Sequence, residues 1–222
     1  MARSSRRSKY AAAAVTLTLV AAAGVTASAH RRDEYLQAAR IAIEPDRVQL
    51  TLHLTPGISV ADEILAGIDR DRDGAISTQE TQVYARELLN TLALDVDGVR
   101  LPLLLVGSTF PAMDAVRNGE GTMRVDAIAR LPRLGDGAHH LHYRNSHRAD
   151  IGVYLANALV PESPRVAVMA QRRDRDQRDV IIDYVLEPDV STRSELQVSA
   201  AAGVGLMSAA AFWWRRRRTE SV

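Results

Sequence analysis

Oxygen-bearing side chains recur at short, regular intervals between residues 69 and 80. They stand at the first, third, fifth, ninth and twelfth positions of this segment, and a backbone carbonyl is available at the seventh. In chain order the six residues are Asp69, Asp71, Asp73, Ala75, Ser77 and Glu80. Calcium takes six to eight oxygen ligands in a loose shell, and this spacing wraps alternate carboxylates around one point. The segment therefore predicts a calcium site, with Glu80 binding through both carboxylate oxygens.

Two further positions of this segment fit the same chemistry. Gly74 stands at the sixth position, where the tight coil needs a backbone conformation that is costly for any residue with a Cβ atom. Ile76 stands at the eighth position and is expected to point away from the ion into apolar surroundings. The alternative is an ordinary acidic turn that binds no ion, because Asp and Gly are also common in turns.

Helices are predicted on both sides of the segment. Residues 61–68 carry apolar residues at helical spacing, with acidic residues in the expected first turn. Ser77 and Glu80 have the spacing of a helix N-cap and its returning carboxylate. Apolar positions for the exiting helix are Val83, Leu88, Leu89, Leu92 and Leu94.

Residues 61–94 resemble the EF-hand calcium-binding family, in the six spaced positions and in both flanking helices. The resemblance implies a helix-loop-helix module with Ca²⁺ as its ligand. A single loop lacks the second loop with which EF-hands normally pair, so calcium is expected to serve a structural role and not to drive a sensor's opening.

The N-terminal residues 1–29 predict a secretory signal peptide. An uncharged run follows the basic residues and ends in the small residues Ala27, Ser28 and Ala29. The basic residues are Arg3, Arg6, Arg7 and Lys9. General secretion is favoured over twin-arginine export, and an uncleaved anchor is the alternative.

Residues 196–214 predict a single transmembrane helix, because they contain no charged residue and would span about 28 Å as a helix. Trp213 and Trp214 would lie at the interface, and the arginines of the basic tail 215–222 would stay in the cytoplasm. Residues 30–195 would then form an extracytoplasmic domain on a single-pass membrane protein. The alternatives are a buried C-terminal helix and a processed sorting tail.

Composition excludes several classes of function. The chain has no cysteine, which excludes disulfides and thiolate metal sites. Residues 30–195 contain 26 acidic residues against 20 arginines, so their formal charge is −6, which argues against a nucleic-acid partner. No nucleophile elbow, zinc-binding His-Glu pair or phosphate-binding glycine loop is present, so no enzymatic activity is predicted.

The rest of the chain predicts a mainly β domain, an antiparallel sandwich with the EF-hand module inserted after the first hairpin. Pro45-Asp46 and Asp97-Gly98 provide hairpin turns between apolar runs, and about nine strands are expected. The predicted strands are 39–44, 48–54, 92–96, 99–106, 122–131, 139–144, 152–159, 165–171 and 180–186.

The histidines offer a second, competing function. Alternation along a strand would place His140 and His142 on one face, where they could share a transition metal. Signal cleavage after Ala29 would make His30 the N-terminus, where its amine and imidazole could bind copper. The alternative is solvent-exposed histidines that bind no metal, and His147 is expected to cap a loop.

A weaker resemblance supports an envelope role. The segments 54–57, 143–148 and 153–161 resemble the exported domain that precedes nickel-permease-like membrane regions in some bacteria, over most of residues 30–190. This chain departs from those proteins in predicting one membrane span where they have a multi-helix permease. The resemblance implies a bacterial envelope protein with a metal-related partner.

Overall fold

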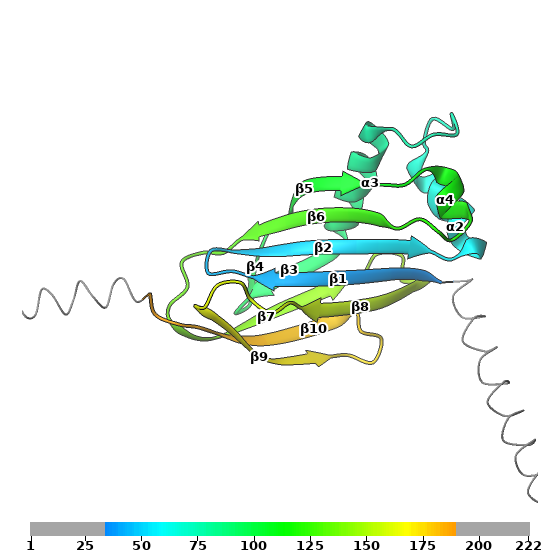
Figure 1. The fold of residues 1–222 in the computed structure, drawn as a ribbon. Helices are drawn as coiled ribbons and strands as arrows, with labels where there is room; N and C mark the ends of the chain where they lie inside the picture. The colour runs from blue at the N-terminus through cyan, green and yellow to red at the C-terminus, as the bar shows by residue number, and fades with distance from the viewer. Residues whose placement is uncertain (1–33, 190–222) are drawn as a thin grey trace, which may run out of the picture.

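The computed structural model describes residues 34–189, which form two five-stranded β-sheets and three helices (Figure 1). The predicted signal peptide, the predicted membrane helix, the basic tail and His30 all lie outside the described residues. Among residues 34–189, no helix is both long and apolar enough to cross a membrane.

The first sheet has the strand order β5-β6-β2-β1-β8. Its strands are β1 (Tyr35–Ile43), β2 (Arg47–Pro56), β5 (Leu104–Thr109), β6 (Met123–Arg130) and β8 (Gly152–Ala158). The β1–β2 hairpin turns at residues 44–46 and closes with Ile43 opposite Val48. All pairs in this sheet are antiparallel except β1–β8, which is parallel.

The second sheet has the order β4-β3-β7-β10-β9 and is antiparallel throughout. Its strands are β3 (Leu92–Val96), β4 (Val99–Arg100), β7 (Gly137–Asn145), β9 (Val166–Arg173) and β10 (Asp179–Leu186). Figure 1 shows the two sheets as stacked layers.

One apolar core lies between the sheets. Alternate residues of each strand point inward, as the period-two pattern predicts, so Ile41 and Leu52 of the first sheet are buried with Leu94, Leu141 and Ile182 of the second. The prediction of a mainly β domain is confirmed, and the two sheets are arranged as a sandwich.

The helices gather at one end of the sandwich (Figure 1). They are α2 (Ile58–Ile68), α3 (Thr78–Asn90) and α4 (Met113–Arg117). Helix α2 packs on α4 through a small separate cluster that includes Leu65 and Val116, and it also buries Ile64 in the main core, where α3 buries Ala85 and Leu88. The helical module is therefore joined to the main core through both α2 and α3.

The predicted helix boundaries need two corrections. Helix α2 begins at Ile58, after Gly57 as N-cap, so Asp62 and Glu63 lie beyond its first turn, which contains no acidic residue. Helix α3 ends at Asn90, and the later leucines, at 92 and 94, belong to β3. The helix-loop-helix unit thus covers residues 58–90.

The predicted strand 99–106 is also divided. Val99 and Arg100 pair with β3, and the Leu101 N–H donates to the Leu94 carbonyl at 2.9 Å. Residues 104–105 and 107–109 pair instead with β6 in the other sheet. The intervening Leu101, Pro102 and Leu103 cross between the layers. Proline cannot donate a hydrogen bond to a sheet, which explains why the strand breaks there.

Candidate metal centre

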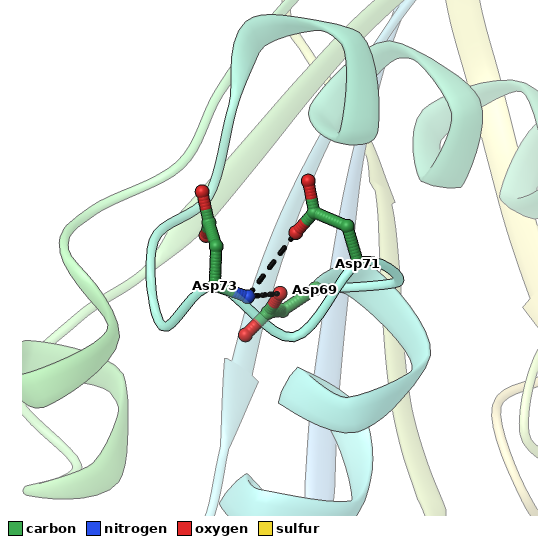
Figure 2. A group of neighbouring side chains, drawn as sticks. All are labelled: Asp69, Asp71 and Asp73. Carbon is green, nitrogen blue, oxygen red and sulfur yellow. Dashed lines mark hydrogen bonds between the residues drawn. The ribbon is translucent and has the colours of Figure 1, made fainter.

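The predicted calcium loop connects α2 to α3 and brings three carboxylates together (Figure 2). One oxygen of each of Asp69, Asp71 and Asp73 lies within 4.8 Å of the others. No other group of three such donors occurs in the part of the chain that the structure describes. Asp69 is buried at the end of α2, and the other two aspartates are exposed.

Backbone amides hold the aspartates in place. The Asp73 N–H donates to Asp69 Oδ1 and to Asp71 Oδ1, each at 3.2 Å, and the Gly74 N–H donates to Asp69 Oδ2 at 3.2 Å. The Ala75 N–H donates to Asp73 Oδ1 at 2.8 Å. These bonds turn the carboxylates toward the inside of the loop and offset part of their mutual repulsion.

Gly74 performs the predicted conformational role. Its φ of +83° lies in the left-handed region, which glycine enters without steric cost. The sequence prediction for Ile76 also agrees with the structure, because its partly buried side chain packs against both apolar clusters. The apolar anchor and the acidic interior of the loop thus lie on opposite sides of one short segment.

Glu80 lies outside the group of three carboxylates. Its Oε1 accepts from the Arg70 N–H at 2.7 Å, and its Oε2 accepts from the Ser77 N–H and hydroxyl at 2.9 and 2.8 Å. The Ser77 hydroxyl in turn accepts from the Glu80 N–H, which completes the predicted capping box of α3. The hydrogen bonds from Ser77, followed by that from Arg70, lower the pKa of Glu80.

These contacts define what metal binding would require of Glu80. A bidentate carboxylate would have to exchange its bonds to Arg70 and Ser77 for bonds to the ion. Ala75 and Ser77 are both in the loop, and their roles as ligands stay predictions, like that of Glu80.

One turn beyond Glu80, α3 is fastened to the sandwich core by a buried polar network. The Tyr84 hydroxyl lies 2.9 Å from the Tyr35 hydroxyl and 3.0 Å from His147 Nε2. The His147 carbonyl accepts from Gln37 Nε2 at 2.9 Å and from the Tyr154 hydroxyl at 2.7 Å. Burial raises the pKa of Tyr84 to about 12 and lowers that of His147 to about 4.

This network was not predicted, except that His147 was expected to form a capping hydrogen bond in its loop. The His147 N–H does donate to Asn145 Oδ1 at 2.9 Å, but the imidazole Nε2 contacts the Tyr84 hydroxyl of α3. Gln37 is the available signal, since it lies at the same strand parity as the inward-facing Tyr35 and Ala39 and must therefore be buried with a hydrogen-bond partner.

Ion pairs tie the helices to their surroundings. Arg70, at the start of the loop, pairs with Glu87 of α3 at 2.5 Å. Arg148 pairs with Glu63 of α2 at 2.5 Å. These exposed pairs contribute little to stability individually, but they restrict how the two helices can move relative to the loop.

His140 and His142 share one face of a strand, as predicted, which is the outer face of β7 in the second sheet, and His139 is turned inward. Each is paired with an aspartate. His140 Nδ1 lies 2.6 Å from Asp183, whereas both ring nitrogens of His142 are occupied, by Asp95 at 3.1 Å and Asp179 at 2.6 Å.

This pairing bears on the predicted transition-metal site. Within residues 34–189, the histidines form no group of three converging metal donors. Metal binding at His142 would have to displace a carboxylate from its ring. Burial lowers the pKa of His142, but the hydrogen bonds to Asp179 and Asp95 outweigh it, so the pKa is raised.

Comparisons of this chain with protein-family models, curated proteins and solved structures find no match. The two resemblances drawn from the sequence therefore stay predictions, and the functional argument rests on the loop and its contacts.

Proposed function

We propose that this protein binds Ca²⁺ in the loop 69–80 and that the ion stabilises the junction between the helical module and the β-sandwich. The convergence of the Asp69, Asp71 and Asp73 carboxylates between two helices is the observation that carries the proposal. Three anionic groups held this close repel one another, and a hard divalent cation relieves that repulsion with the oxygen ligands it prefers.

A structural role fits the surroundings of the loop better than a switching role. Helix α3 is anchored in the main core and in the polar network of Tyr84, so its position is already defined. No second loop of this kind occurs among residues 34–189 to form the usual pair. The ion would cross-link the end of α2 to the start of α3 and limit fraying at both.

We further propose that the domain lies outside the cytoplasm on a single C-terminal membrane anchor. The support comes from the signal-like and apolar segments of the sequence. An affinity of roughly 10⁻⁴ to 10⁻³ M would be sufficient for a calcium site in that location.

Calorimetric titration of the purified full chain in detergent, after treatment with a chelator, tests calcium binding. We expect one Ca²⁺ per chain and weaker binding of Mg²⁺, whose strict octahedral geometry the open loop does not provide. Glu80→Gln should abolish or strongly weaken binding while keeping the capping box, since Gln also serves there. Glu162→Gln changes an exposed acidic residue far from the loop and is the matched control.

Absence of binding at millimolar calcium would refute the proposal. Equal affinity in Glu80→Gln and in the control would refute the assignment of Glu80 as a ligand. Retained binding in Glu80→Gln together with lost binding in Asp71→Asn would restrict the site to the three aspartates.

A second candidate function is transition-metal binding with nickel, cobalt or copper, through His140, His142 and His30. One observation favours it. Asp183 holds Nδ1 of the exposed His140, which is how carboxylates commonly orient a metal-binding imidazole and leave Nε2 for the ion. Titration of the full chain with Ni²⁺ and Cu²⁺ tests it, and unchanged affinity in the double variant His140→Ala, His142→Ala would refute it.

A further inference from the structure

Helix α3 lies beside the edge strand β5 (Figure 1). A groove runs between the two elements. Its volume is about 570 Å³. One wall consists of Thr78, Gln82 and Arg86, which recur every four residues and therefore share one face of α3. The other wall is the chain from 103 to 108. A second hollow of about 350 Å³ continues the groove past the C-terminal end of α3.

The strand beside this groove has an unpaired edge. In the described part of the chain, β5 pairs only with β6, and no hydrogen bond connects it to α3. Leu104 and Val106 are 48% and 63% exposed. Val106 is the extra residue of a bulge and has no partner on β6. The bulge shortens the regular part of this edge, and on either side of it the strand presents free N–H and C=O groups to an extended chain that approaches it.

The opposite side of the sandwich shows how this protein protects an edge. There, Arg173 Nε of β9 donates to the carbonyl of Ala156 on β8 at 2.9 Å, and the Ala158 N–H donates to Gln171 Oε1 at 3.1 Å. Side chains of the edge strand β9 thus form hydrogen bonds with main-chain groups of the edge strand β8. Among residues 34–189, no side chain covers the main chain of β5 in this way.

The charge of the groove is opposite to that of the domain. Arg86 and Arg100 line it, and no described acidic residue does. Arg86 forms no ion pair with any residue from 34 to 189, whereas Arg100 donates to the Leu92 carbonyl at 2.6 Å. An unpaired arginine at the wall of the groove, in a domain whose formal charge is −6, favours an anionic occupant.

We infer that this groove docks an extended segment of a partner protein with alternating apolar and acidic side chains. The segment adds to β5 as a further strand, so that main-chain hydrogen bonds provide affinity and alternate side chains provide specificity. Side chains on its α3-facing side meet Gln82, Arg86 and Leu89, with a carboxylate opposite Arg86. The inference does not depend on calcium.

Fluorescence anisotropy of the full chain in detergent tests this docking. The probes are three fluorescein-labelled nonapeptides: alternating Val and Glu, alternating Val and Lys, and the Val-Glu peptide with N-methylated main-chain amides. We expect saturable binding of the Val-Glu peptide, weaker binding of the Val-Lys peptide by about 2- to 30-fold, and loss of binding on N-methylation.

Variants of the protein localise the binding to the groove. Arg86→Glu should reverse the preference, so that the Val-Lys peptide binds more tightly than the Val-Glu peptide. Gln82→Glu, one turn earlier on the same face, should weaken binding of the Val-Glu peptide. Arg133→Glu removes an exposed arginine in a distant loop and should change neither affinity. Thermal unfolding establishes that each variant is folded.

Three results would overturn the inference. Equal binding of the parent and N-methylated peptides would exclude strand addition. Unchanged affinity in both Arg86→Glu and Gln82→Glu would place binding elsewhere. A dimer of the full chain in sedimentation, dissociated by Val106→Glu, would show that a second copy occupies this edge.

Discussion

Tyr84→Phe isolates the hydrogen bonds that fasten the helical module to the sandwich. The substitution removes only a hydroxyl, because Phe keeps the ring and its edge-on contacts with Phe110 and His147, at centroid distances of 5.8 and 5.6 Å. What is lost are the contacts of 2.9 Å to the Tyr35 hydroxyl and 3.0 Å to His147 Nε2.

The expected cost follows from the burial of the groups left behind. The Tyr35 side chain is 0% exposed and that of His147 is 9% exposed, so water cannot readily replace the missing partner. A buried polar group left without a hydrogen bond costs about 1 to 3 kcal/mol. Tyr35 is assigned this full range and the slightly more exposed His147 about 1 kcal/mol, so the total cost is about 2 to 4 kcal/mol. For a domain of this size, the melting temperature should fall by about 4 to 16 °C.

Thermal unfolding followed by circular dichroism, with the full chain in one detergent, measures this loss. Tyr184→Phe is the matched control, because its hydroxyl is also buried but has no hydrogen-bond partner among the described residues. Removing an unsatisfied hydroxyl should change the free energy of unfolding by less than about 1 kcal/mol. Equal destabilisation by both substitutions would refute the claim that the Tyr84 hydroxyl joins the module to the core.

Further predictions concern pH and metals. The pKa of His147 is about 4 in the folded protein, below its ordinary 6.5, so between these pH values the unfolded chain binds more protons than the folded one. The free energy of unfolding should therefore fall by up to about 3 kcal/mol as the pH is lowered from 6.5 to 4. His147→Gln should flatten this pH dependence in denaturant titrations. The pKa of His142 is raised in the folded protein, so its effect on stability has the opposite pH dependence. The stability that protonated His142 contributes should be lost as the pH rises through its folded-state pKa, which an NMR titration of the imidazole would follow. Calcium at 10 mM should raise the melting temperature by about 3 to 10 °C for an affinity of 10⁻⁴ to 10⁻³ M. Glu80→Gln should remove that shift and leave copper or nickel binding unchanged, whereas His140→Ala with His142→Ala should do the reverse.

The loop was predictable because its determinants are local. The left-handed conformation at Gly74, the capping box of Ser77 and Glu80, and the alternation of aspartates each depend on residues a few positions apart. The first hairpin was predictable for the same reason, since a short turn fixes the register of its two strands.

Features that depend on distant parts of the chain were not predictable from sequence. The apolar run 99–106 looked continuous, and only pairing with β6 moves residues 104–109 into the other sheet. Pro102 indicates a break in the strand, but the sheet that each half joins depends on which strands lie nearby. The ligand geometry of Glu80 is a related case, because one sequence pattern, Ser followed three residues later by Glu, serves both a capping box and the closing position of a calcium loop.

The position of Glu80 and Tyr84 on α3 explains why calcium should act as a brace. Residues four apart lie on the same side of a helix, so the side chain that would close the loop and the side chain that enters the core network are one turn apart. A movement of α3 large enough to open the loop would withdraw the Tyr84 hydroxyl from Tyr35 and His147. The free energy that opposes this withdrawal is similar in size to what a weak calcium site provides, so on the proposed function ion binding would add to the rigidity of the junction without displacing the helix.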